Sequence, residues 1–596
     1  MPYETRESIP TQYTWDLSSM YENDDAFLQA LEATKAYPEQ FLAFRGTIAQ
    51  DPAQLLAFLQ LDDAVGIELG KLVNYANRKS DEDTRDSTYQ DYSAQVITLY
   101  TQIAGSQSWF SSELLTLKDE QMEAFYAQEP QLEGYRRALD RVFAHREHTL
   151  SPAEEKLLAS AADMASQPEN IFSLLNDADL TFADAADARG EMHPVTHGSY
   201  IPLMMSPDRT LRHNAYQNLY ATYRQFRNTC AATLGAQMKQ QKFYADARKY
   251  ESTLEAALNG TEVPVEVYTN LIEAVRRNLP AMYKYIDVRR RLLGLDELHF
   301  WDLYVPVVED VEMEFTYEEA CDLILRALAP MGEEYLSLVK MGLESRWVDV
   351  YETPGKRSGA YSAGSYGTHP VMLLNFQGKL DDVFTLIHEM GHSIHTYLSC
   401  KNQPPVYSDY VIFVAEVAST CNEALLTRYL LDTTTDERER AYILNHFLEQ
   451  FRGTIYRQCM FAEFELRVNE MVAEGRGVTA DALCELYHQL NEDYYGPGIV
   501  MDDDIAVEWA RIPHFYYQYY VFQYATGFAA AIALSQRILT EGENAVHDYL
   551  GFLSGGCSKT PIELLRGAGV DMATTQPIDD ALAWFDELVD QMAQLA

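Results

Sequence analysis

The segment from residue 380 to residue 400 joins an apolar helical periodicity to the motif H-E-x-x-H, and this pairing constrains the fold most. The motif consists of His388, Glu389 and His392. A separation of four residues places the two imidazoles on one helical face, about 6 Å apart, where both can bind one metal ion. Glu389 lies about 100° around the helix from His388. It can therefore reach a water molecule beside the ion instead of the ion itself.

A metal that takes part in hydrolysis needs a third protein ligand and one open position. The extended motif H-E-x-x-H-x-x-G-x-x-H cannot supply that ligand, because His395 stands at the glycine position and Leu398 at the third histidine position. His395 shares the face of the histidine pair. We interpret it as a packed or outer histidine, since one helix rarely presents three ligands to one ion. Another element must therefore provide the third ligand.

A second helical pattern starts near Asp409 and carries Glu416 and Glu423, which share a face because they are seven residues apart. Glu416 stands among valines and alanines, and a buried glutamate without a partner is costly unless a cation compensates it. We therefore predict Glu416 as the third ligand. Glu423 has two interpretations: it bonds the outer nitrogen of a ligand histidine, or it is a solvated helix carboxylate. Imidazole and carboxylate ligands favour zinc.

The charge of the chain excludes some classes of partner. It has 90 acidic and 46 basic residues, a formal net charge of −44, which would repel nucleic acid and anionic membranes, so we expect neither as a partner. The excess serves solubility, or it forms an acidic cleft that attracts basic peptides. We see no membrane-spanning stretch of roughly 20 apolar residues and no secretory signal. Seven scattered cysteines without a C-x-x-C pair are typical of reduced thiols, so we expect a cytoplasmic protein.

At 596 residues the chain is too long for one simple core, so we expect two or more lobes. Most of the sequence has helical periodicity, which predicts a mainly α fold. The pattern breaks at residues 180–201, where Asp187 to Gly190 can form a turn between two short strands. We place a boundary at this break, between an N-terminal helical region, residues 1–200, and a catalytic region, residues 201–596.

A second break in the helical pattern lies directly before the H-E-x-x-H helix. Residues 354–377 are rich in glycine, serine and tyrosine and contain the apolar run VMLLNF at 371–376. The run is a strand candidate, so we expect a small β element beside this helix. An extended peptide could pair with such a strand through backbone hydrogen bonds.

Near the C-terminus the run HFYYQYYVFQY begins at His514. Its spacing predicts that His514, Tyr517, Tyr520 and Tyr524 lie close to one helical face. Aromatic stripes usually pack in a core, and we assign most of the run that role. A core would accept phenylalanine equally well, however, whereas each buried phenol needs a hydrogen-bond partner.

Several motifs together resemble the thimet oligopeptidase and oligoendopeptidase F group of metallopeptidases. They are HEMGHSIH at 388–395, AEVASTCNE at 415–423, the segment with VMLLNF, IPHFYYQYYVFQYATGFAAA at 512–531 and WDLSSMY at 15–21. The likeness spans nearly the whole chain and is densest from about 355 to 535. More distant members have Pro-Ser where this chain has Ala418-Ser419, which favours the oligoendopeptidase F branch.

The resemblance implies a mainly α, two-lobed metallopeptidase whose deep substrate channel admits short peptides, with the N-terminal region as part of the channel wall. It implies one zinc ion per chain, bound by His388, His392 and Glu416, with Glu389 as the general base. It also implies a set of donors to the substrate carbonyl and the developing oxyanion: His514, Tyr517, Tyr520 and Tyr524.

We therefore expect a zinc-dependent endopeptidase that hydrolyses internal bonds of short oligopeptides. Two alternatives stay open: a zinc exopeptidase or peptidyl-dipeptidase, and a non-catalytic peptide-binding protein with a structural zinc. A charge that binds a peptide terminus would favour the first, and we locate none in the sequence. Glu389 counts against the second, because a structural site needs no base and favours a fourth protein ligand. The sequence leaves the oligomeric state and the preferred cleavage site open.

Overall fold

The structure, a computed structural model, describes residues 3–308, 311 and 313–595. These residues are mainly helical with a few small sheets, which confirms the predicted fold class. The chain forms two compact units, each built from three stretches of sequence. Unit 1 contains Met1–Pro152, Glu312–Leu426 and Leu534–Gly569, and unit 2 contains Ala153–Val311, Thr427–Ala533 and Val570–Ala596. The functional division at residue 200 stays a prediction.

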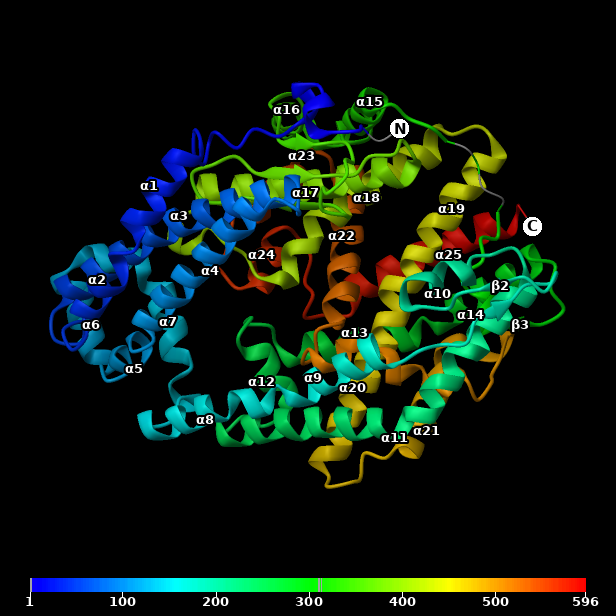
Figure 1. Ribbon diagram of the computed structural model, residues 1–596, viewed down its shortest axis with the longest axis horizontal. Coiled ribbons are helices and arrows are strands. Elements are labelled where there is room, and N and C mark those ends of the chain that lie inside the picture. Colours follow the sequence, from blue (N-terminus) through cyan, green and yellow to red (C-terminus); the bar gives the residue numbers. More distant parts are fainter. Residues whose placement is uncertain (1–2, 309–310, 312, 596) are drawn as a thin grey trace. The chain divides into compact units, whose positions relative to one another are not determined.

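Unit 1 holds the H-E-x-x-H helix, α17 (Leu380–Asn402), which packs against α16 (Gly332–Glu344) and α23 (Glu543–Leu553) (Figure 1). The other helices of unit 1 are α1 (Asp24–Thr34), α2 (Tyr37–Ala43), α3 (Pro52–Glu82), α4 (Ser87–Gln107), α5 (Phe110–Leu114), α6 (Asp119–Gln128), α7 (Arg136–Ala144), α15 (Tyr317–Ala327), α16 (Gly332–Glu344), α23 (Glu543–Leu553) and α24 (Pro561–Gly567). The division between the units falls within α18 (Ile412–Thr433) and within α22 (Phe522–Glu541).

The predicted β element is a three-stranded sheet in unit 1. Its strand order is β4 (Val348–Asp349), β6 (Val371–Leu373), β5 (Tyr361–Ala363), with β4 parallel and β5 antiparallel to β6. Both β5 and β6 contact α17. Val371 and Leu373 are fully buried in the apolar cluster formed by the N-terminal helices. The sheet therefore contacts both that cluster and the H-E-x-x-H helix. The expected β element beside this helix is confirmed.

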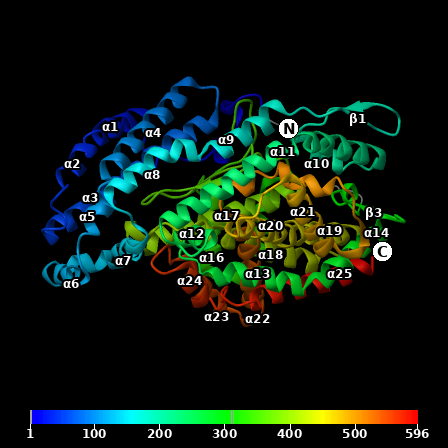
Figure 2. The ribbon, with the colours of Figure 1, turned by 90° about the horizontal axis from the view of Figure 1, so that it is seen from below.

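Unit 2 is built around the long helix α11 (Arg209–Ala247), which packs against α20 (Arg457–Ala473) and α21 (Ala480–Tyr495) (Figure 2). Its other helices are α8 (Pro152–Ala165), α9 (Gln167–Leu174), α10 (His197–Met204), α12 (Thr253–Asn259), α13 (Val265–Arg277), α14 (Leu279–Leu292), α19 (Glu437–Phe451), α20 (Arg457–Ala473), α21 (Ala480–Tyr495) and α25 (Gln576–Ala593). Two short strands, β3 (Leu298–His299) and β7 (Ile499–Val500), pair in parallel.

The turn predicted at Asp187 to Gly190 is confirmed. It connects β1 (Ala185–Ala186) to β2 (Met192–His193), and the two strands pair antiparallel. The Asp187 carboxylate accepts the backbone N–H groups of residues 189 and 191, each at 2.9 Å, which is the local bonding that favours aspartate in a turn.

Helix α17 begins where its sequence offers a partner for the first backbone N–H groups. Oδ2 of Asp382 accepts from the backbone nitrogen of Lys379 at 2.8 Å and from that of Gln377 at 3.0 Å. Such a carboxylate in the first turn satisfies orphan donors and complements the helix dipole. Among the residues that the structure describes, no helix is both long and apolar enough to span a membrane.

Candidate active site

Helices α17 and α18 approach each other closely at Gly391. A Cβ atom on Gly391 would lie 2.7 Å from the carbonyl oxygen of Ala418 in α18, so only glycine permits this approach. The buried side chain of Asn422 links the same helices. Its Nδ2 donates to the carbonyl oxygen of Ile387 at 3.2 Å, and its Oδ1 accepts from the Tyr335 hydroxyl at 2.9 Å. The backbone next to His388 is thereby fixed to α18.

This contact brings the three predicted ligands together. The Nε2 atoms of His388 and His392 are 3.1 Å apart. Oε2 of Glu416 lies 3.4 Å from Nε2 of His388 and 3.5 Å from Nε2 of His392. The Glu416 carboxylate of α18 therefore lies at nearly the same distance from both imidazoles of α17.

The three donor atoms fit one metal ion. Zinc bonds of about 2.0–2.2 Å in a tetrahedral site put neighbouring ligand atoms about 3.3–3.6 Å apart. The separations of 3.4 and 3.5 Å lie within this range, and the third, 3.1 Å between the two imidazole nitrogens, is slightly shorter. Among the described residues, no fourth histidine, cysteine, aspartate or glutamate joins the group within 4.8 Å. Three protein donors with one position left open are typical of a catalytic zinc site rather than a structural one.

Glu416 is more exposed than we expected. Its side chain keeps 39% of its accessible surface, so the carboxylate is half-buried and not fully buried as predicted. The valines beside it in the sequence are buried, but successive helix residues point about 100° apart, so buried neighbours do not bury Glu416. The exposed side of the group leaves room for water and a substrate.

Hydrogen bonds hold the donor groups in orientation. Oε1 of Glu423 bonds Nδ1 of His388, so Nε2 of that imidazole is left for the metal. The hydroxyl of Ser419 donates to Oε2 of Glu416 at 3.1 Å. Of the two interpretations of Glu423, the structure favours the partner of a ligand histidine.

The carboxylates around His388 and His392 stabilise positive charge in the donor group. Burial disfavours the charged imidazole of His388, but its hydrogen bond to the Glu423 carboxylate and the charges of the nearby glutamates raise its pKa to about 9. Burial would raise the pKa of Glu416, but both imidazoles and Ser419 lower it to about 2. A divalent cation supplies the same sign of charge to these groups.

Glu389 is buried beside the donor group and has an unused oxygen. Its side chain is 7% exposed, and Oε2 has no hydrogen-bond partner among the described residues. Burial raises the pKa of this carboxyl, although the two imidazoles lower it in part. A buried acceptor without a partner next to a metal site can receive a proton from a water molecule there.

His395 packs in the core and does not join the donor group. It is 1% exposed, and its ring stacks on that of Tyr410 with centroids 3.7 Å apart. This confirms the interpretation as a packed histidine. Burial lowers its pKa to about 3, so it stays neutral.

The predicted peptide-binding strand needs a correction. The run 371–376 contributes β6, but β6 lies between β4 and β5, so both of its edges are already paired. The outer strand on the α17 side is β5, which contacts that helix. The hydroxyl of Ser362 in β5 is 2.8 Å from that of Ser393 in α17. An added strand would therefore have to pair with an outer strand of this sheet, and β5 is the outer strand that is bonded to α17.

The C-terminal aromatic residues in unit 2 do not form one helix, so the predicted helical face is wrong. His514 belongs to a short 3₁₀ helix, Pro513–Tyr516, and α22 begins only at Phe522. Between them, Gln518 and Tyr519 have positive φ angles of 52° and 55°.

The structure nevertheless brings the four predicted residues together. Ring centroids of Tyr517, Tyr520 and Tyr524 lie 5.6, 6.5 and 6.2 Å from that of His514. The hydrogen-bond capacity of one histidine and three phenols is therefore gathered at one place in unit 2. Burial lowers the pKa of His514, which favours its neutral form.

Comparison with known proteins gives the family. Residues 202–584 match Peptidase family M3, and residues 113–182 match Oligopeptidase F. The chain is 45% identical over 590 residues to Oligopeptidase PepF of Bacillus subtilis (strain 168), covering 99% of this chain and 88% of that protein. It is also similar to solved structures of oligoendopeptidase-F from Enterococcus faecium (TM-score 0.74, 37% identity, 97% and 99% of the two chains) and of a chain from Chlamydophila abortus (TM-score 0.95, 36% identity, 100% of both).

With its mainly helical fold and its His-His-Glu donor group, the chain belongs to peptidase family M3. It is a peptidase of a family of metallopeptidases, and the donor group is suited to a metal.

Two residues that shape the site were missed in the sequence. Gly391 lies inside the motif, but only the facing backbone of α18 shows why it must be glycine. Asn422 is fully buried and bonds two other elements. An asparagine amid an apolar helical run is a signal that could have drawn attention to it, because a buried amide requires partners.

Proposed function

We propose that this chain is a zinc-dependent endopeptidase that hydrolyses internal bonds of short oligopeptides. The observation that carries the proposal is the group of three donor atoms, 3.1 to 3.5 Å apart, with Glu389 buried beside it and its Oε2 without a partner among the described residues. We propose one zinc ion per chain, held by His388, His392 and Glu416, because two imidazoles and one carboxylate suit that metal. When bound, the ion supplies Lewis acidity and lowers the pKa of water to about 7.

In the proposed reaction Glu389 is the general base. A water molecule attacks the carbonyl carbon of the scissile bond while Glu389 accepts its proton. The same carboxyl then delivers the proton to the nitrogen of the leaving amine as the C–N bond breaks. Burial supports both steps, because a carboxyl with a raised pKa releases its proton less readily to bulk water and holds it for the amine.

The remaining roles are proposed from the resemblance. His514, with Tyr517, Tyr520 and Tyr524, donates hydrogen bonds to the substrate carbonyl and the developing oxyanion. The gathering of the three tyrosine rings around His514 supports this role. Removing one such donor typically costs about two orders of magnitude in rate.

We propose that the peptide pairs in extended form with β5, because backbone pairing ignores side-chain identity and suits varied short peptides. We also propose residues 1–200 as an N-terminal region that contributes to the channel wall and residues 201–596 as the catalytic region. A cytoplasmic location is supported by the seven cysteines, all of which are free of disulfides.

The test is the digestion of quenched peptides of about 5 to 20 residues, with the products identified by mass spectrometry. The proposal expects internal cleavage that is lost on chelation and restored by zinc. Products shortened from one end by one or two residues would replace it with an exopeptidase. A zinc-loaded chain that binds the peptides and leaves them whole would show a binding protein instead.

A further inference from the structure

A strained turn in unit 2 separates His514 from Tyr520. Gln518 and Tyr519 both have left-handed backbone angles, with φ of 52° and 55°. For residues other than glycine, this conformation is unfavourable because the Cβ atom crowds the backbone. Two such residues in succession persist only where other groups hold them, so the structure must contain anchors for the turn.

Four hydrogen bonds anchor this turn on its two sides. Nε2 of Gln237 donates to the carbonyl oxygen of Tyr516 at 2.9 Å, and the Tyr516 hydroxyl is 2.8 Å from Oγ1 of Thr233. On the other side, the backbone nitrogen of Tyr519 donates to Oε1 of Glu465 at 2.7 Å. The Tyr519 hydroxyl is also 2.8 Å from Oγ1 of Thr253.

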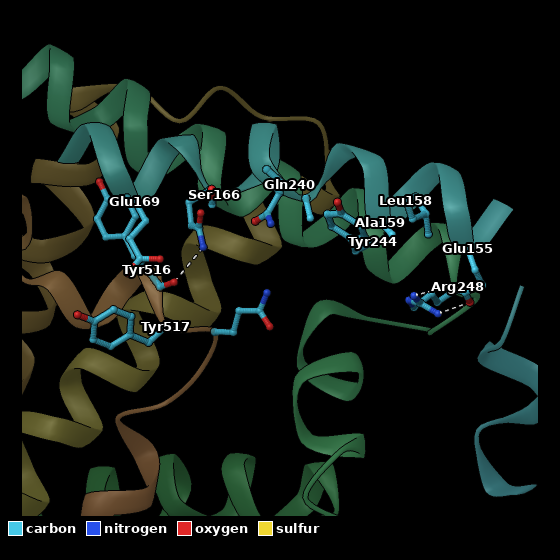
Figure 3. A pocket seen from close by; sticks show the side chains of 14 residues that line it. Glu155, Leu158, Ala159, Ser166, Glu169, Gln240, Tyr244, Arg248, Tyr516 and Tyr517 are labelled. Atoms are coloured by element: carbon cyan, nitrogen blue, oxygen red, sulfur yellow. Dashed lines mark hydrogen bonds and ion pairs between the residues drawn. The ribbon is translucent and has the colours of Figure 1, made fainter. Parts of the chain in front are cut away.

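The anchored rings are buried, whereas the ring between them in the sequence is exposed. Tyr516 and Tyr519 are 5% and 2% exposed, whereas Tyr517 between them is 45% exposed. Figure 3 shows Tyr516 and Tyr517 at one end of a cavity of about 580 Å³, which the side chains of α8, α9 and α11 line farther along. The turn thus directs Tyr517 and Tyr520 toward His514, with ring centroids 5.6 and 6.5 Å away.

Glu465 in α20 is the least expected of the anchors. Its side chain is fully buried. Among the described residues, Glu465 forms no ion pair with a cation. Its second oxygen, Oε2, has no hydrogen-bond partner there. Burial raises its pKa to about 8. Burying such a group costs free energy. The hydrogen bond that Glu465 accepts from the Tyr519 N–H in the strained turn is what it provides to the structure.

We propose that Glu465 is a positioning residue for the reaction: its bond to the Tyr519 backbone holds the left-handed turn that sets Tyr517 and Tyr520 beside His514. The inference rests on the proposed function, because it gives the tyrosines a role in that reaction. In the proposed mechanism, Glu465 itself contacts neither the substrate nor the metal.

The first test compares Glu465→Ala with Glu465→Gln. The alanine variant should lower kcat by about 10- to 100-fold, at most the loss expected for an oxyanion donor itself, and leave KM within about threefold. The glutamine variant keeps an acceptor oxygen and should stay within about threefold of the wild type in kcat. Met471→Ala, which truncates another buried side chain of α20, is the control for destabilisation and should leave kcat unchanged.

The second test places Glu465→Ala in a Tyr517→Phe/Tyr520→Phe background. If Glu465 acts through the two hydroxyls, its effect on kcat should largely vanish where they are absent, because residues that act as a unit are not additive. A full multiplicative loss in this background would overturn the inference. So would a Glu465→Ala enzyme with the kcat of the wild type, or one that loses no more than Met471→Ala. A wild type that cleaves no peptide would instead refute the proposed function and the inference with it.

Discussion

Gly391 of α17 lies against the carbonyl of Ala418 in α18, at a distance that leaves no room for a Cβ atom. Two residues before Ala418, α18 carries Glu416, the predicted ligand that completes the donor group. The separation of the two helices at Gly391 therefore sets the distance from Glu416 to both imidazoles.

Gly391→Ala should separate these helices and weaken metal binding by at least tenfold, because the methyl group would meet backbone atoms that cannot rotate away. Zinc affinity measured by competition with a chelator tests this. Gly105→Ala in α4 is the matched control, since its Cβ would meet no atom within 4 Å. The control should bind zinc as the wild type does and gain up to about 1 kcal/mol in stability. An unchanged zinc affinity in Gly391→Ala would contradict the role of this contact.

Glu423→Ala should lower zinc affinity by about 10- to 100-fold, because the bond to Nδ1 of His388 fixes the ring that presents Nε2 to the metal. The same chelator competition measures the effect. Asp432→Ala, on the same helix with a side chain 57% exposed, should leave the affinity unchanged. Equal affinities in the two variants would show that the contact does not orient His388.

Glu465→Gln should remove a pH dependence of stability. The folded pKa of about 8 lies above the unfolded value of about 4.3. The folded state therefore holds the proton more tightly. The stability from this group is complete below about pH 4.3 and is lost as the pH rises through 8, by on the order of a few kcal/mol.

Urea midpoints at pH 6 and pH 9 measure this change. The wild type should lose more between the two values than Glu465→Gln. Glu508→Gln is a control in the same unit, because the guanidiniums of Arg457 and Arg511 outweigh burial and hold the Glu508 pKa at about 2. That substitution should lower both midpoints without changing the difference between them. Identical differences in all three proteins would contradict a raised pKa at Glu465.

The grouping of His388, His392 and Glu416 was predictable because the information for it is local. The spacing of His388 and His392 on one helix fixes their common face, and a ligand on the next helix had few candidates. The features that could not be predicted from the sequence depend on contacts between elements. The central position of β6 comes from its pairing with both β4 and β5, and a strand's neighbours are not written in its own residues.

The aromatic run at His514 shows a second limit. Its spacing is compatible with a helix, but anchors far away in the sequence, including Gln237 and Glu465, hold a turn there instead. Tertiary hydrogen bonds thus overrule the local pattern. The rings still gather around His514, so the grouping of the residues was predicted for the wrong structural reason.

The most direct test of the account is the kcat of Glu389→Gln at a measured zinc content, because this carboxyl is predicted to move the proton without binding the ion. Glutamine has nearly the same shape and cannot accept the proton. The proposed mechanism predicts a variant with one zinc per chain, peptide binding close to that of the wild type, and a kcat at least three orders of magnitude lower. A zinc-loaded Glu389→Gln protein that cleaves peptides within tenfold of the wild-type rate would contradict it.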